Sequence, residues 1–76
     1  MKNFVEYLLV RLVSHPDELS VTEEKTAEGL IIRISVNAED LGRVIGRGGK
    51  VIKAVRKLIQ VKAAKDNLKV SVILQE

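Results

Sequence analysis

The sequence predicts a two-layer α+β fold with the element order α-β-β-α-α-β. Three observations support this prediction: apolar residues recur with helical spacing in three segments, they alternate with other residues elsewhere, and a glycine-bounded turn separates the last two helical segments. The 76 residues, of which 46% are apolar, are enough for one small core. We therefore expect a single domain, residues 1–76, with a three-stranded mixed sheet covered on one face by three helices.

The first half of the chain predicts a helix and a β-hairpin. Apolar side chains with i, i+3, i+4, i+7 spacing indicate an amphipathic helix over residues 1–13, and Pro16 lies in the turn that follows. Residues 20–26 are β-branched and charged, as is typical of an exposed edge strand, and a turn at 27–29 connects them to the next strand. One face of that strand is buried, because other residues alternate with Leu30, Ile32, Ile34 and Val36.

The second half predicts two helices and a last strand. Asn37 is suited to cap a short helix that Gly46 ends, and Asp40 lies in its first turn, where a carboxylate is favourable. A longer helix is expected over residues 50–65, followed by a strand in which polar residues alternate with Leu68, Val70, Val72 and Leu74. The two-helix connection is long enough for a right-handed crossover, so the last two strands should be parallel and the first two antiparallel.

The charges divide the chain into two unequal parts. Residues 41–65 contain no acidic residue and eight basic ones: Arg43, Arg47, Lys50, Lys53, Arg56, Lys57, Lys62 and Lys65. The rest of the chain has five basic residues against all ten carboxylates. Basic residues on a helix usually form its solvated face, but here no Glu or Asp compensates their mutual repulsion. A polyanionic partner is the better explanation of the pattern.

The turn Gly46-Arg47-Gly48-Gly49 lies inside this basic segment. Glycine lets the chain turn sharply and lets a phosphate oxygen approach backbone amides that a side chain would shield. The next helix starts here, so an anion is favoured near its first amides, at Gly49 and Lys50. The turn is therefore suited to holding a nucleic-acid backbone.

The same residues carry a family resemblance. Ile45, Gly46, Gly49 and Ile52 match the signature Ile-Gly-x-x-Gly-x-x-Ile, and with this element order the whole chain resembles the type II KH domain. Residues 41–44 and the chain length are similar to those of the KhpA (YlqC) family of small bacterial single-KH proteins. The resemblance implies binding of single-stranded RNA, with the loop clamping the backbone of about four nucleotides.

The resemblance also assigns roles to residues around the loop. It implies a backbone clamp made of Gly46, Arg47, Gly48 and Gly49. Cations would extend the phosphate track at Arg43, Lys50 and Lys53, and an aliphatic floor under the bases would be formed by Val44, Ile45 and Ile52. The exposed edge of the last strand, around residues 69–71, would complete the groove.

This interpretation links the affinity of the protein for RNA with its pairing. Residues 41–74 contain no aromatic side chain on which a base could stack, so one copy should bind weakly, with low sequence specificity and marked salt dependence. Joining two modules relieves such weakness.

On the long helix, a second apolar stripe lies beside the core stripe and either faces a partner or is covered by another helix: Ala54, Leu58 and Val61. The resemblance implies a homodimer or a heterodimer with a larger KhpB (Jag/EloR)-like protein, and a role as RNA chaperone or post-transcriptional regulator linked to cell elongation and wall homeostasis.

Enzymatic interpretations fail on specific residues. A P-loop needs Ser or Thr after Lys50, and a dinucleotide-binding loop needs a further glycine, but Val51 occupies that position. His15, beside Pro16, fits a solvated turn better than catalysis. Solvation and helix capping explain three carboxylate pairs better than metal binding does: Asp17/Glu18, Glu23/Glu24 and Glu39/Asp40. We expect a non-enzymatic protein without a metal, cofactor or small-molecule substrate.

Two alternatives to RNA binding stay open. The chain could be a protein-protein adaptor in which RNA contact is incidental, or it could bind single-stranded DNA, because no residue is identified as a reader of the 2′-hydroxyl. The sequence has no cysteine, signal peptide or membrane-spanning stretch, so we expect a cytoplasmic protein with no membrane partner.

Overall fold

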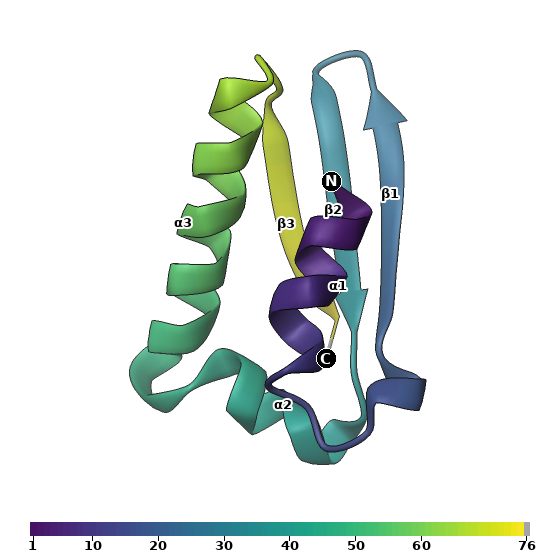
Figure 1. Cartoon of the computed structure of the whole chain (residues 1–76), viewed down its shortest axis with the longest axis vertical. Helices are drawn as coiled ribbons and strands as arrows, with labels where there is room; N and C mark the ends of the chain where they lie inside the picture. Colours follow the sequence, from purple (N-terminus) through teal and green to yellow (C-terminus); the bar gives the residue numbers. More distant parts are fainter. Residues whose placement is uncertain (76) are drawn as a thin grey trace.

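The computed structural model describes residues 1–75 and confirms the predicted fold class (Figure 1). Its elements are α1 (Lys2–Val10), a 3₁₀ turn η1 (Pro16–Glu18), β1 (Ser20–Thr26), β2 (Gly29–Ser35), α2 (Ala38–Ile45), a second 3₁₀ turn η2 (Arg47–Gly49), α3 (Lys50–Lys65) and β3 (Val70–Gln75). The bounds of β1 and α3 agree with the sequence prediction. Within residues 1–75, none of the helices has the length and hydrophobicity that crossing a membrane requires.

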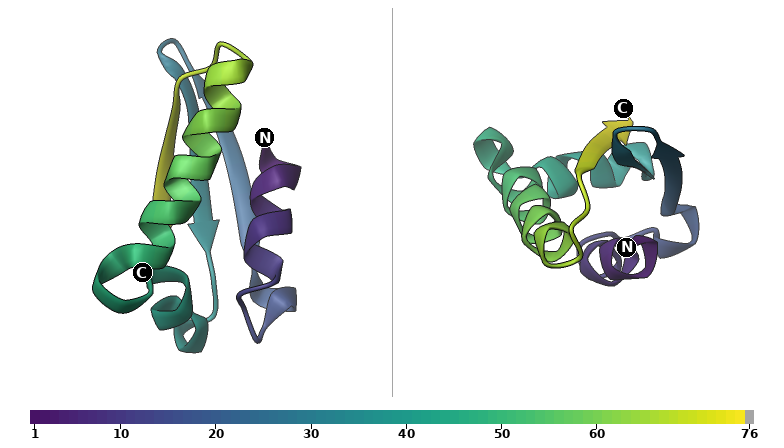
Figure 2. Two further views of the ribbon diagram at one scale, coloured as in Figure 1. Left: turned by 60° about the vertical axis from the view of Figure 1, so that its left-hand side comes forward. Right: turned by 90° about the horizontal axis from the view of Figure 1, so that it is seen from above.

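The sheet has the predicted mixed topology, with strand order β1-β2-β3. β1 pairs antiparallel with β2, with Val21 opposite Ile34, and β2 pairs parallel with β3, with Leu30 opposite Val70. Helices α1 and α3 lie against one face of the sheet, and α2 runs across the end at which β2 stops and α3 begins (Figures 1 and 2). This arrangement puts the α2–α3 connection at one end of the molecule.

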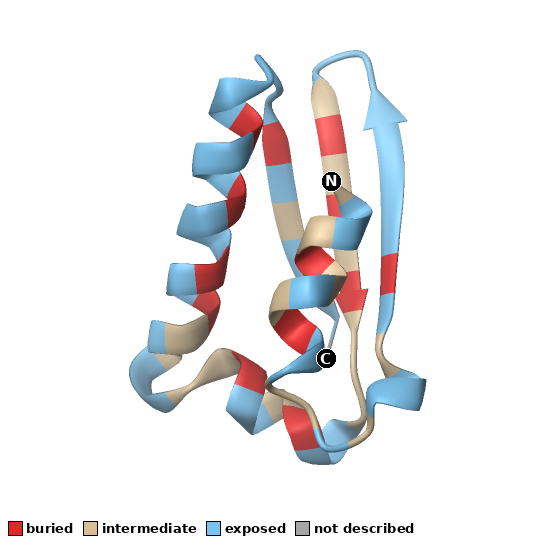
Figure 3. Cartoon of the chain, in the orientation of Figure 1, coloured by how far each residue is buried: buried red, intermediate tan, exposed pale blue. Residues whose placement is uncertain are grey.

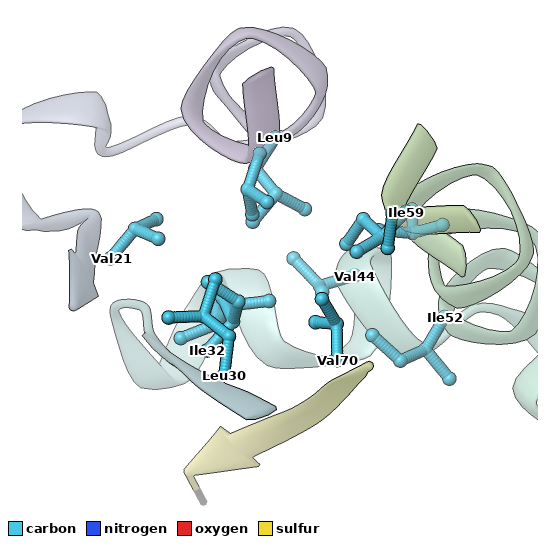
Figure 4. Packing of buried hydrophobic residues seen from close by; sticks show 12 residues of the cluster. Leu9, Val21, Leu30, Ile32, Val44, Ile52, Ile59 and Val70 are labelled. Atoms are coloured by element: carbon cyan, nitrogen blue, oxygen red, sulfur yellow. The ribbon is translucent and has the colours of Figure 1, made fainter. Parts of the chain in front are cut away.

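The core lies between the helices and the sheet. β2 buries alternate residues, as its sequence predicts, and α3 buries one stripe with helical spacing. Figure 3 shows where the buried positions lie along each element, and Figure 4 shows their side chains meeting. The buried apolar residues come from every helix and strand except the 3₁₀ turns: Val5, Leu9, Val21, Leu30, Ile32, Ile34, Val44, Ile52, Val55, Ile59, Ala63 and Val70.

The largest differences from the predicted boundaries are at the end of α1 and the start of β3; β2, which begins at Gly29 and ends at Ser35, is only slightly displaced from its predicted position. α1 ends at Val10 rather than near Val13, because the amide of Leu12 bonds to the carbonyl of Leu9 in a tighter turn. β3 starts at Val70, and Leu68 is 43% exposed rather than buried. The cause is the end of α3: Asn67 has a φ of 56°, and the amide of Leu68 bonds back to the carbonyl of Ala63 at 2.8 Å, as in a Schellman motif.

Candidate nucleic-acid interface

Residues at both ends of α2 define where the glycine loop lies. The side chain of Asn37 accepts a hydrogen bond from the amide of Glu39 at 2.8 Å, which caps the helix as predicted. Gly46, with a φ of 76°, ends it, while its amide still donates to the carbonyl of Gly42 at 2.8 Å. The chain therefore leaves α2 abruptly and enters α3 after only Gly46 and the three residues of η2.

The glycines of the loop serve different purposes. A Cβ on Gly46 would lie 2.4 Å from Cγ2 of Val51, so this position has no room for a side chain. Gly48 and Gly49 have φ angles of 63° and 77°, but a Cβ on either would meet nothing within 4 Å. Glycine is thus needed at 46 for both packing and conformation and at 48 and 49 for conformation, and the last two positions face open space.

Internal hydrogen bonds occupy two of the amides that the sequence suggested for an anion. The amide of Gly49 donates to the carbonyl of Gly46 at 3.0 Å, and that of Lys50 donates to the carbonyl of Arg47. The prediction of an anion at Gly49 and Lys50 was therefore wrong in detail, because the loop uses these donors to close its own turn.

The charge separation seen in the sequence is also a separation in space. Of the eight cations in residues 41–65, only Arg43 lies within 4 Å of a carboxylate in the described part of the chain. Arg47, Lys50 and Lys53 are exposed. β1, which carries two exposed glutamates, lies on the side of the molecule opposite α3 (Figures 1 and 2). The loop and α3 thus form a basic surface.

Comparison with known proteins identifies the family of the chain. The family model described as "KhpA/KhpB, KH domain" matches residues 2–74. The chain belongs to the KhpA/KhpB KH-domain family. It is 36% identical to the RNA-binding protein KhpA of Chlamydia caviae over 76 residues, covering all of this chain and 97% of that relative. It is 39% identical to the protein of the same name from Clostridium perfringens over 72 residues, covering 95% of this chain and 96% of that relative. No solved structure is significantly similar to the chain.

The aliphatic residues around the loop of this KH domain differ in accessibility. Val44 is fully buried and Ile52 is 6% exposed, so both belong to the core (Figure 4). The expectation that they form a floor in contact with bases was wrong, because helical spacing turns them inward beneath the loop. Ile45 is only partly buried and keeps some accessible surface.

The edge of β3 that was expected to complete the groove, around residues 69–71, lies far from the glycine loop. Nε2 of Gln60 donates to the carbonyl of Val70 at 2.6 Å, so the start of β3 lies beside the third turn of α3, whereas the loop precedes its first turn. Residues 69–71 are therefore at the opposite end of the helix from the loop. The carboxyl end of β3 is the part that points toward the loop end of the KH domain (Figures 1 and 2).

A buried carboxylate fastens α2 to the chain that follows α1. Asp40 is 1% exposed, and its two oxygens accept hydrogen bonds from the amides of Ser14 and His15, each at 2.9 Å. The Ser14 amide is the largest cause of a lowered Asp40 pKa; burial opposes it, while the His15 amide and the charges of His15 and Arg43 add to it. The sequence prediction that solvation and capping account for Asp40 was wrong.

The second apolar stripe of α3 is exposed. Leu58 and Val61 are 50% and 52% exposed, and Ala54 is exposed as well, so the alternative that another helix covers them was wrong. Leu58 and Val61 border a shallow hollow beside Phe4 of α1, where the Lys62 ammonium lies 5.3 Å from the centre of the Phe4 ring. Within residues 1–75, no group of three or more His, Cys, Asp or Glu side chains could hold a metal ion.

Proposed function

We propose that this KH domain binds single-stranded RNA through the loop Gly46-Arg47-Gly48-Gly49, without catalysing a reaction. The observation that carries the proposal is a loop whose two open glycines lie between exposed cations. The names of the relatives, which are RNA-binding proteins, support the same function.

In the bound state, a phosphate oxygen approaches the amides of Arg47 and Gly48, and the Arg47 guanidinium adds a charge-assisted hydrogen bond. Lys50 and Lys53 continue the contact along the first turns of α3, and Ile45 offers a small apolar surface to a base. Most of these interactions are with the backbone of the nucleic acid, so we expect weak sequence specificity.

The exposed stripe of Ala54, Leu58 and Val61 supports a second part of the proposal. Apolar side chains that project from a basic helix are stabilised when a partner covers them. We infer that the protein pairs through α3 with a second copy or with a KhpB (Jag/EloR)-like protein, so that two weak sites act together. Such a complex would act in the cytoplasm as an RNA chaperone or post-transcriptional regulator linked to cell elongation.

A double substitution in the loop tests the RNA-binding proposal. Arg47→Asp with Gly48→Asp places two carboxylates at the phosphate, so binding to a labelled single-stranded RNA should be lost. Arg47→Gln with Gly48→Asn is the matched control: Asn and Asp both tolerate a positive φ, but the control adds no negative charge. It should bind more weakly than the wild type and more tightly than the Asp variant. RNA binding unchanged in the Asp variant would overturn the proposal.

The exposed Leu58 and Val61 also favour the adaptor alternative, in which RNA contact is incidental. The same Asp variant separates the two functions, because an adaptor keeps its protein partner and its cellular role when the loop is reversed in charge. Parallel titrations with single-stranded RNA and DNA at two salt concentrations then show whether the 2′-hydroxyl contributes.

A further inference from the structure

The segment between α1 and η1 reaches the loop-bearing helix through a side chain as well as through its backbone. The amides of Ser14 and His15 bond to Asp40, as described above, and the Ser14 hydroxyl accepts a hydrogen bond from Nη1 of Arg43. Arg43 lies in the last turn of α2, immediately before the glycine loop. A segment far away in the sequence therefore restrains the side chain of a cation that belongs to the last turn of α2.

Arg43 is restrained and accessible at the same time. Its side chain is 61% exposed, and Nη1 lies 3.9 Å from Oδ1 of Asp40. A guanidinium has five N–H donors, so the bond to Ser14 leaves most of them for an acceptor outside the protein. Among residues 1–75, no hydrogen bond or ion pair restrains the side chains of Arg47, Lys50 or Lys53.

We propose that Ser14 is a positioning residue for RNA binding: its hydroxyl orients the Arg43 guanidinium toward a phosphate next to the one held by the loop. The inference rests on the function proposed above. A side chain that is already ordered loses less conformational freedom on binding than a mobile one. Arg43 therefore contributes more to the affinity for RNA than an unrestrained cation of the same charge on this surface.

The competing explanation is that Ser14, Arg43 and Asp40 only stabilise the joint between α1 and α2. Ser14→Ala separates the two explanations. It removes the hydroxyl of this exposed residue, but it keeps the hydrogen bond from the backbone amide of residue 14 to Asp40, and it changes no charge. Ser14→Thr keeps a hydroxyl and is the conservative control. Arg43→Gln removes the charge itself.

The experiment measures the affinity of the full chain for a labelled single-stranded oligouridylate at several salt concentrations. We expect Ser14→Ala to weaken binding about threefold to tenfold through lost preorganisation, with an unchanged salt slope because no charge is lost. Ser14→Thr should bind like the wild type. Arg43→Gln should lower the slope of log affinity against log salt by about 0.7, the loss of one phosphate contact on a single strand.

Three results would each overturn the inference: wild-type affinity in Ser14→Ala, an equal loss in Ser14→Thr, or an unchanged salt slope in Arg43→Gln. The Arg47→Asp, Gly48→Asp variant is titrated alongside. If it binds RNA like the wild type, the proposed function itself fails. If it loses RNA while the Ser14 and Arg43 variants do not respond as expected, only the positioning role fails.

Discussion

The side chain of Val51, in the first turn of α3, fills the space in which a Cβ of Gly46 would lie. Such a Cβ would be 2.4 Å from Cγ2 of Val51 and 2.9 Å from its backbone nitrogen. The beginning of α3 therefore packs directly on the glycine that ends α2, and this contact sets the path of the loop between them. Gly48, two residues further on, has no such neighbour.

Alanine substitutions at Gly46 and Gly48 should have unequal costs. Gly48, with φ 63° and ψ 19°, is in the left-handed region, where alanine costs about 1 to 2 kcal/mol of folding free energy. Gly46, with φ 76° and ψ 170°, is in a region that is essentially restricted to glycine, where the backbone strain costs about 1 to 3 kcal/mol. Gly46→Ala adds a clash with Val51, worth about 1 to 3 kcal/mol more. Urea unfolding measures the difference. Equal destabilisation of the two variants would show that the contact with Val51 does not constrain the loop.

Gly42→Ala should stabilise the protein. Gly42 lies inside α2, is exposed, and has no atom within 4 Å of the position of an added Cβ. Alanine restricts the unfolded chain and favours helix, so the free energy of unfolding should rise by about 0.5 to 1 kcal/mol. A fall in the urea midpoint would indicate that the surroundings of α2 leave no room for a side chain at position 42.

Asp40 should make stability depend on pH in the acid range. Its pKa is lower in the folded protein than its ordinary value of 3.8, so the folded state favours the ionised carboxylate. This stability is fully present above the ordinary pKa and is lost as the pH falls through the lowered value. Asp40→Asn should therefore be less stable than the wild type at neutral pH, and the gap should narrow as the pH falls below 3.8.

Thermal melts of both proteins across this pH range check the prediction. Asp17→Asn is a suitable control, because Asp17 is exposed in η1 and its change should leave the melting temperature nearly unaltered. A gap between wild type and Asp40→Asn that stays constant down to the most acid pH would contradict the assigned role of the charge.

Pairing through α3 should respond to salt in the opposite sense to RNA binding. The charged residues of α3 around Leu58 and Val61 are all basic, so self-association brings cations of two copies together. Salt should therefore strengthen pairing by screening their repulsion. Leu58→Ser with Val61→Ser should weaken pairing at least about tenfold, because apolar surface would no longer be buried. Sedimentation equilibrium measures both effects.

Ala64→Ser is the control for this surface, since Ala64 is exposed on α3 outside the apolar stripe. It should pair like the wild type. If the Leu58, Val61 variant also pairs normally, or if the wild type is monomeric at every concentration, α3 is not the pairing surface.

The local features of the fold could be read from the sequence because their causes lie close together in the chain. The Asn37 cap, the end of α2 at Gly46 and the alternation in β2 each depend on residues within a few positions. The family signature added the position of the loop between two helices. The arrangement of strands followed from the length of their connections.

The sequence failed where a residue's environment comes from a distant segment. Asp40 looked like a first-turn carboxylate, but the amides that bury it are 25 and 26 residues away. In the sequence, Leu68 fits the alternation of β3, but in the structure the turn at Asn67 leaves Leu68 outside the strand. Val44 and Ile52 flank the loop, and Ile52 belongs to its signature, but only the packed structure shows that both point into the core.

The amide chemical shifts of the full chain, followed by NMR while single-stranded RNA is added, test the central claim most directly. The amides of Arg47 and Gly48 should move most, followed by those of neighbouring residues in the last turn of α2 and the first turn of α3, and the changes should shrink as salt is raised. Shifts confined to the Leu58 and Val61 surface or to the open face of the sheet would contradict an RNA-binding loop.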